Sequence, residues 1–136
     1  MEIDFDKSGG LVPAVIQDDT SGEVLMLGFM NAASYQETQR CGEVVFFSRS
    51  RNKLWKKGES SGHLLKVREV RVDCDGDALL VRVSPVGPGV CHEGYRSCFF
   101  RSLGEDGTPR IVAERTFEPE AVYPKPAAGK AAEGDQ

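Results

Sequence analysis

Two kinds of metal-ligating side chain are concentrated in a stretch of 26 residues. Three aspartates alternate along the chain, one cysteine lies between the first two of them, and two further cysteines follow. Thiolates suit Zn²⁺, whereas clustered carboxylates suit Mg²⁺, Mn²⁺ or Ca²⁺. The stretch therefore predicts sites for a soft and a hard metal ion, with the candidate ligands Asp73, Cys74, Asp75, Asp77, Cys91 and Cys98.

The spacing of the aspartates predicts a divalent cation. If residues 73–77 are extended, the three carboxylates share one face and Cys74 points to the other. Like charges on one face repel one another unless a cation neutralises them. The run is not an EF-hand loop, because Gly76 stands at the fourth position instead of the sixth and Ser84 replaces the closing glutamate.

The cysteine spacing favours an open zinc site. Six residues including Gly94 separate Cys91 from Cys98, so the ends of this loop can converge on one ion, and Cys74 lies 17 residues before Cys91. This spacing is not that of a zinc finger or ribbon, and three thiolates leave a fourth position for water. His92 could fill that position or act as a base beside it. The alternative is that these are ordinary buried cysteines.

Composition and charge limit the class of protein. A chain of 136 residues with a net charge of −4 indicates one globular domain and argues against nucleic acid as a partner. The N-terminus has no signal-peptide pattern, and no run approaches the ~20 apolar residues of a membrane span. We therefore expect a cytoplasmic protein without a membrane partner, whose cysteines are ligands or nucleophiles and not disulfides. Cys41, which lies apart, is interpreted as a packing residue.

A basic segment, residues 49–62, contains five cations, three serines and two glycines. Guanidinium and ammonium groups, with hydroxyls and closely approaching glycine amides, bind phosphate monoesters. We expect a long loop here, anchored by Trp55. The alternative is a solvated loop whose charges serve only solubility.

The remaining pattern predicts the elements that position these groups. Residues 11–18 and 23–30 form a hairpin, with Pro13 indicating a sheet edge or a strand start. Asn31 caps a helix at residues 32–40 that Gly42 ends. Further strands are expected at residues 43–48, 63–72 with a bulge near Arg68 and Glu69, 78–83 and 98–102. The predicted fold is α+β, a mostly antiparallel sheet with few short helices, and residues 124–136 have the composition of a disordered tail.

Several of these segments together closely resemble the phosphoribosyl-AMP cyclohydrolase family, which catalyses the third step of L-histidine biosynthesis. The resemblance rests on residues 24–31, 47–51, 54–62, 72–80 and 89–99, in that order along the chain. It implies a cyclohydrolase domain over residues 1–104 and a C-terminal extension over residues 105–136. The extension is too short and too rich in Pro, Ala and Gly for the pyrophosphohydrolase domain of some relatives, so we expect a monofunctional enzyme.

The resemblance implies that the enzyme opens the six-membered ring of the adenine base in phosphoribosyl-AMP, a small phosphorylated nucleotide, to give the phosphoribosyl-formimino intermediate. It implies Zn²⁺ and Mg²⁺ as cofactors, with zinc on Cys74, Cys91 and Cys98 and magnesium on Asp73, Asp75 and Asp77. It also implies a homodimer with active sites at the interface and zinc ligands drawn from both chains.

The roles of the other residues are expectations from the same reaction. His92 adjoins a cysteine that the resemblance makes a zinc ligand, and imidazole is the side chain best suited to proton transfer near neutral pH, so His92 is the candidate for proton transfer. His63 is its rival, or else a structural or substrate-contact residue. The candidates for the two substrate phosphates are Arg49, Arg51, Lys53, Lys57, Ser60, Ser61 and Gly62.

Two other classes of protein stay open on the sequence. A structural-zinc binding module would need a fourth protein ligand and would hold zinc without catalysis. A thiol redox protein would need a close cysteine pair such as C-x-x-C, and the chain has none.

Overall fold

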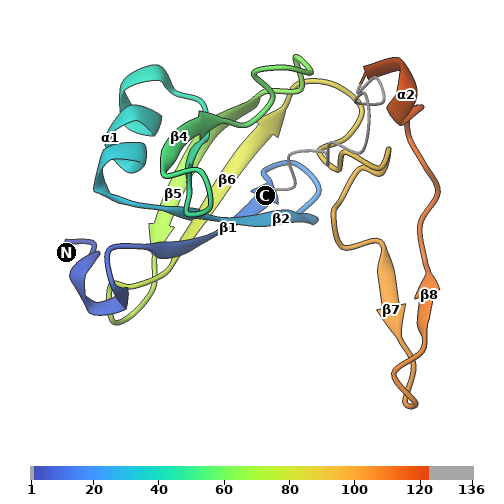
Figure 1. Ribbon diagram of the computed structural model, residues 1–136, viewed down its shortest axis with the longest axis horizontal. Helices are drawn as coiled ribbons and strands as arrows, with labels where there is room; N and C mark the ends of the chain where they lie inside the picture. The colour runs from blue at the N-terminus through green and yellow to red at the C-terminus, as the bar shows by residue number, and fades with distance from the viewer. Residues whose placement is uncertain (1, 123–136) are drawn as a thin grey trace.

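A four-stranded sheet forms the centre of the protein, whose computed structural model describes residues 2–122 (Figure 1). Its strands are β1 (Val12–Asp18), β2 (Val24–Met30), β5 (Leu65–Val72) and β6 (Leu79–Pro85), in the order β2-β1-β6-β5. The β1–β2 and β5–β6 pairs are antiparallel and β1–β6 is parallel. The predicted α+β class, mostly antiparallel with few helices, is confirmed; the tail predicted from residue 124 lies outside the described residues.

The smaller elements surround this sheet. They are η1 (Asp6–Ser8), α1 (Ala32–Cys41), β3 (Val45–Ser48), β4 (Lys53–Lys56), β7 (Arg101–Leu103), β8 (Pro109–Ile111) and α2 (Pro119–Val122). Helix α1 and the β3–β4 hairpin cover one face of the sheet (Figure 1). The fully buried Phe46 of β3 belongs to the core. No helix within residues 2–122 is long and apolar enough to cross a membrane.

Strand β1 lies inside the sheet, between β2 and β6. The prediction that Pro13 indicates an edge is therefore wrong, while its alternative, a strand start, is confirmed. Pairing with β6 begins only at Ala14, opposite Leu79, so the missing N–H of Pro13 precedes that ladder.

Helix α1 begins at the predicted residue and has the predicted caps, Asn31 and Gly42, but it ends at Cys41, one residue later than predicted. Asn31 Oδ1 accepts a hydrogen bond from the Ser34 amide at 2.8 Å, and Ser34 Oγ accepts one from the Asn31 amide at 3.0 Å. Gly42 ends the helix in the left-handed conformation, with φ of 76°. The buried Thr38 hydroxyl accepts a hydrogen bond from the Val45 amide at 3.0 Å and thereby ties the helix to β3.

Two bulges interrupt the main sheet. The register of β5 against β6 shifts between Val67 and Glu69, so the predicted bulge at Arg68 is confirmed. A second bulge, which the sequence pattern did not indicate, lies in β2, where Ile16 faces Met26 but Gln17 faces Val24. The extra residue, Leu25, lies on a strand at the edge of this sheet, where its carbonyl can accept a hydrogen bond from a loop.

The segments around the basic stretch and the C-terminal strand differ from expectation. Residues 49–62 are not one long loop, because β4 pairs with β3 along its whole length. The strand expected at residues 98–102 is shorter and later, as β7, and it pairs with β8. The β7–β8 hairpin projects away from the rest of the molecule (Figure 1).

Candidate metal centres

The three aspartates lie on the tight turn that joins β5 to β6. An extended segment was considered from the sequence, but the structure shows a turn. Gly76 adopts a φ of 81° and reverses the chain. Asp73 Oδ1 accepts hydrogen bonds from the amides of Asp77 at 3.0 Å and Ala78 at 3.2 Å, which folds the turn. One oxygen from each of the three carboxylates lies within 4.8 Å of the others, so the turn brings the predicted ligands together.

The charges on this turn are partly balanced by a lysine. Lys7 Nζ lies 3.1 Å from an oxygen of Asp75 and 3.4 Å from an oxygen of Asp77. The Lys7 ammonium lowers the pKa of Asp75, while the Asp75 carboxylate raises the pKa of Asp77. The carboxylate oxygens already bind one cationic group, the Lys7 ammonium. Oxygen ligands are also those that Mg²⁺ prefers, so these residues fit a divalent cation.

Cys91 and Cys98 lie on a loop that is anchored to β2. The Cys98 amide donates a hydrogen bond of 2.7 Å to the carbonyl of Leu25, the bulged residue. Ser97 Oγ donates one of 2.8 Å to the Val24 carbonyl. The Cys91 amide closes the loop by donating to the Tyr95 carbonyl at 3.1 Å. The two cysteines lie in one small buried cluster, so the predicted convergence of the loop ends is confirmed.

The two thiols form a coupled pair. The Cys98 thiol donates a hydrogen bond to Cys91, which lowers the pKa of Cys91 to about 6. The same bond and partial burial raise the pKa of Cys98. The Glu93 amide also donates to Cys91 Sγ, at 3.4 Å. A soft ion such as Zn²⁺ binds thiolates, and it can displace the one proton that this thiolate–thiol pair retains. The two residues therefore fit zinc.

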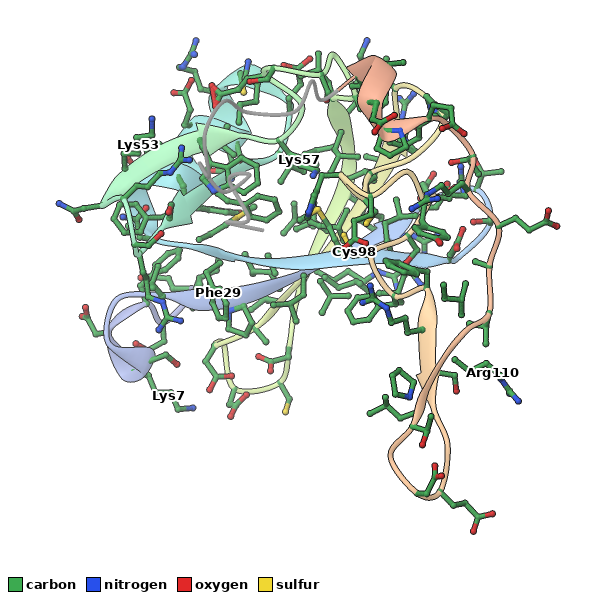
Figure 2. All side chains as sticks on the ribbon, turned by 45° about the vertical axis from the view of Figure 1, so that its right-hand side comes forward. Lys7, Phe29, Lys53, Lys57, Cys98 and Arg110 are labelled. Atoms are coloured by element: carbon green, nitrogen blue, oxygen red, sulfur yellow. The ribbon has the colours of Figure 1, made fainter. Side chains whose placement is uncertain are left out.

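Lys57 lies beside this thiol pair. Its side chain is only 5% exposed, its ammonium lies 5.8 Å from the centre of the Trp55 ring, and both thiols interact with its charge. Burial lowers the pKa of Lys57. Lys57 and Cys98 lie near one another at the centre of the molecule in Figure 2. A buried cation next to thiols can stabilise their ionised form.

Cys74 lies far from the thiol pair of the same chain. It is exposed on the aspartate turn, which precedes β6, whereas Cys91 follows β6. The seven residues of β6 span roughly 20 Å. Among residues 2–122, the aspartates are the one group of three metal-ligating side chains that converges. A single chain therefore does not bring the three cysteines together.

The two histidines have different surroundings. His92 is half-buried, and its charge contributes to the lowered pKa of Cys91. His63 is buried, and its Nδ1 lies 3.0 Å from the Gly89 carbonyl oxygen. A Cβ atom at Gly87 would lie only 2.5 Å from the His63 ring. The rings of His63 and Phe117 are in T-shaped contact, with their centres 5.0 Å apart. His63 thus packs tightly against the loop that leads to Cys91.

The expected phosphate contacts fall into two groups, at opposite ends of β4. Three of them, Arg49, Arg51 and Lys53, are exposed at the tip of the β3–β4 hairpin. The turn after β4 carries Lys57, Ser60, Ser61 and Gly62 and leads to His63. Lys53 and Lys57 lie clearly apart in Figure 2. The second group is the one next to the thiol pair, through Lys57.

Residues 115–117 support the cysteine loop, and sequence reasoning missed this role. Arg115 Nε donates a hydrogen bond of 2.9 Å to the Glu93 carbonyl, and the Thr116 amide donates one of 2.8 Å to the Gly94 carbonyl. A side chain at Gly94 would begin 2.6 Å from the Phe117 carbonyl oxygen. These contacts join residues about 22 positions apart, and no local pattern indicates them.

Comparisons with known proteins identify the family. The sequence model of phosphoribosyl-AMP cyclohydrolase matches residues 26–100. A protein of that name from Solibacter usitatus is 57% identical over 123 residues, 90% of this chain and 97% of that protein. One from Nitratidesulfovibrio vulgaris is 51% identical over 120 residues, 88% of this chain and 94% of its own length. One from Methanosarcina barkeri is 52% identical over 124 residues, 89% and 92% of the two chains. The chain belongs to the phosphoribosyl-AMP cyclohydrolase family.

Proposed function

We propose that this protein hydrolyses phosphoribosyl-AMP, opening the six-membered ring of the adenine base to give the phosphoribosyl-formimino intermediate of L-histidine biosynthesis. The observation that carries the proposal is the position of the family match, because residues 26–100 include both the thiol pair and the aspartate turn. We place the reaction in the cytoplasm, where all four cysteines would remain the free thiols that metal binding requires.

Two metal ions complete the proposed site. Zinc is held by Cys91 and Cys98 together with Cys74, and magnesium by Asp73, Asp75 and Asp77. Support comes from the lowered pKa of Cys91, since thiolates are the form that binds metal, and from the convergence of three carboxylate oxygens. Zinc in such a site supplies Lewis-acid activation of a water molecule for attack on the ring carbon that carries the amino group.

The protein side chains bind the substrate and move protons. His92, next in the chain to Cys91, is the proposed proton-transfer group. Lys57 supports the negative charge of the thiolates, from a buried position that excludes water. The proposed phosphate contacts divide between the two ends of β4, with Arg49, Arg51 and Lys53 at one end and Ser60, Ser61 and Gly62 at the other; His63 supports the loop between them and the thiols.

The active form is proposed to be a homodimer, in which Cys74 of the partner completes the zinc site. Cys74 lies at the opposite end of β6 from the other two thiols of its own chain, so a second copy can supply the third ligand. Exposed apolar side chains support this association: Leu27 and Phe29 on β2, and Leu103 and Ile111 on the projecting hairpin. Patches of this kind on a small protein mark interaction surfaces.

Ring opening can be measured directly by ultraviolet difference absorbance. Purified protein is assayed on phosphoribosyl-AMP with zinc and magnesium present, and then with each ion withheld by chelation. We expect turnover that needs both ions. Cys91→Ser should lose bound zinc and turnover together. Cys41→Ser is the matched control, because Cys41 ends α1, where its thiol donates to the Glu43 carbonyl at 3.5 Å.

A folded, zinc-loaded dimer that does not turn over phosphoribosyl-AMP would contradict the proposed reaction. The structural-zinc module would then be the better description, or a different phosphorylated purine the substrate. Retention of full activity by Cys91→Ser would instead remove this cysteine from the zinc site.

Mixed dimers test the shared zinc site separately. Cys74→Ser and Cys91→Ser chains each lack a ligand, so each homodimer should bind little zinc. When the two are refolded together, one of the two sites in a mixed dimer regains all three thiols. We expect the mixture to recover up to a quarter of the wild-type zinc content, since half of the dimers are mixed and each of these has one intact site of two. No recovery would mean that the ligands of each site come from one chain.

A further inference from the structure

Lys7 is a cation that contacts the aspartate turn from a distant part of the chain. It lies in η1, the short N-terminal turn, and is 68 residues away in sequence from Asp75. Its ammonium lies 3.1 Å from Asp75 and 3.4 Å from Asp77, and its side chain is 44% exposed. Figure 2 shows Lys7 at the N-terminal end of the molecule, well away from the thiol pair marked by Cys98.

The backbone holds Lys7 in this position. The Asp4 amide donates a hydrogen bond of 2.7 Å to the carbonyl of Gly76, in the centre of the aspartate turn. The Lys7 amide donates to Asp4 Oδ1 at 3.1 Å, which continues this connection to η1. The Glu2 carbonyl oxygen lies 3.1 Å from the point where a side chain at Gly76 would begin. The N-terminal segment is therefore docked on the turn, and the fold delivers Lys7 to the carboxylates.

An ammonium and a divalent cation compete for these oxygens. Mg²⁺ binds carboxylate oxygens at about 2.0–2.1 Å with near-octahedral geometry. An ammonium that hydrogen-bonds the same oxygens would repel the ion, because two positive charges would lie only a few ångström apart. Lys7 is on a flexible four-carbon stem and half-exposed, so it can move into water when a metal ion binds.

We propose that Lys7 is a tethered competitor for the divalent cation: its ammonium occupies the aspartate turn until Mg²⁺ displaces it, so that Lys7 sets the affinity of this site. The inference rests on the magnesium site of the proposed function. The new element is that releasing Lys7 costs free energy and so weakens cation binding. The N-terminal segment would also respond to whether the cation is bound.

The test is the affinity of the zinc-loaded protein for Mn²⁺, followed by electron paramagnetic resonance of the free ion. Lys7→Gln removes the competing charge and should bind Mn²⁺ about two- to fivefold more tightly than wild type, as expected for partly exposed ion pairs. Lys66→Gln is the matched control: it removes the same charge from an exposed position on β5 and should change the affinity less than twofold.

The outcomes separate this inference from the site itself. Equal affinities of wild type and Lys7→Gln, with loss of binding in Asp77→Asn, would overturn the role of Lys7 and leave the aspartate site intact. Weaker binding by Lys7→Gln would also overturn it. If neither wild type nor Lys7→Gln binds Mn²⁺, the aspartate site fails and the inference fails with it.

A second measurement reports on Lys7 directly. In wild type, saturation with Mg²⁺ should shift the ε-methylene resonances of Lys7, because the ammonium leaves the carboxylates. The resonances of Lys66 should stay in place. Unchanged Lys7 resonances in a magnesium-saturated sample would show that the ammonium is not displaced, and would contradict the proposal.

Discussion

Lys57 differs from the other cations of the basic segment in its burial. Its ammonium is enclosed next to the ring of Trp55 and the sulfurs of Cys91 and Cys98, whereas Lys53 on the preceding strand is exposed. An unscreened positive charge beside thiolates stabilises them far more than the same charge in water. The contribution of Lys57 to metal binding should therefore exceed that of any exposed lysine of the segment.

Replacing Lys57 by Met should lower zinc affinity by about tenfold, the effect of one pKa unit on a ligand thiol. Competition with a chromophoric chelator measures this, and Lys53→Met is the control, expected to stay within twofold of wild type. Met also removes a buried charge, so urea unfolding of the metal-free protein should begin no earlier than in wild type. Unchanged zinc affinity in Lys57→Met would show that its charge does not act on the thiols.

At the scale of elements, one ion pair fastens the cysteine loop to the β1–β2 hairpin. Asp18, at the end of β1, is 3% exposed and contacts the Arg96 guanidinium. Arg96 Nε also donates to Glu23 at 2.8 Å. Burial alone would raise the pKa of Asp18, but hydrogen bonds from Thr20 and Ser21 and the charge of Arg96 outweigh it, and the pKa is lowered. The loop is thus held in part by an ionised carboxylate.

Asp18→Asn should lower the free energy of unfolding by about 1–2 kcal/mol at pH 7, less than for a fully buried pair because Arg96 is partly exposed. Because the folded-state pKa is below the unfolded value, the wild-type carboxylate contributes its full stability above about pH 4, and loses it as the pH falls through the folded pKa. Urea unfolding between pH 7 and pH 3 should therefore show a smaller loss for Asp18→Asn than for wild type.

The control for this prediction is Asp19→Asn, which affects the more exposed pair of Asp19 with Arg82 at 3.0 Å. We expect that change to cost less than about 1 kcal/mol. If Asp18→Asn has the same stability and the same acid sensitivity as wild type, the pair does not hold the loop.

For the whole molecule, the β7–β8 hairpin is the feature that a single chain does not explain. All six residues of its two strands are exposed, with Leu103 69% and Ile111 56% exposed. An isolated two-stranded hairpin is marginally stable in water. The proposed homodimer accounts for this arm if its apolar face packs against the partner.

Leu103→Asp together with Ile111→Asp should shift the protein from dimer to monomer and reduce its zinc content, because each zinc site would lose its third thiolate. Sedimentation velocity and metal analysis measure the two effects. Ser102→Asp is the control: Arg101 pairs with Ile111 and Leu103 with Pro109, so Ser102 points to the other face of the hairpin. A dimer of normal zinc content in the double variant would exclude this face from the interface.

Local chemistry explains which parts of the fold the sequence predicted. The caps of α1 at Asn31 and Gly42 and the bulge at Arg68 depend on a few neighbouring residues, and each was predicted at the right position. Strand β4 was missed because its residues, Lys53–Lys56, are polar at both ends and gain strand character from pairing with β3. The internal place of β1 depends on its parallel pairing with β6, more than 60 residues away, and no local signal reports that.

In the candidate site too, local features were predicted from the sequence and long-range contacts were not. The residue types predicted a carboxylate group and a thiol pair, and both groups form. The aspartate run is not the extended segment considered from the sequence: Gly76 turns the chain, and the turn brings the carboxylates together. Lys7, Lys57 and Arg115 reach these groups from distant segments, so their contacts follow only from the fold.

The position of Cys74 between two carboxylates of one turn has a thermodynamic consequence. In the proposed site, a thiolate ligand for zinc and carboxylate ligands for magnesium share the same few backbone torsions, so binding of either ion would alter the free energy of ordering the turn for the other. Thermodynamic linkage then requires reciprocity. If bound zinc changes the affinity for magnesium by some factor, bound magnesium must change the affinity for zinc by the same factor. In the proposed dimer this exchange would cross the interface, because the turn that binds one protomer's magnesium would also complete its partner's zinc site.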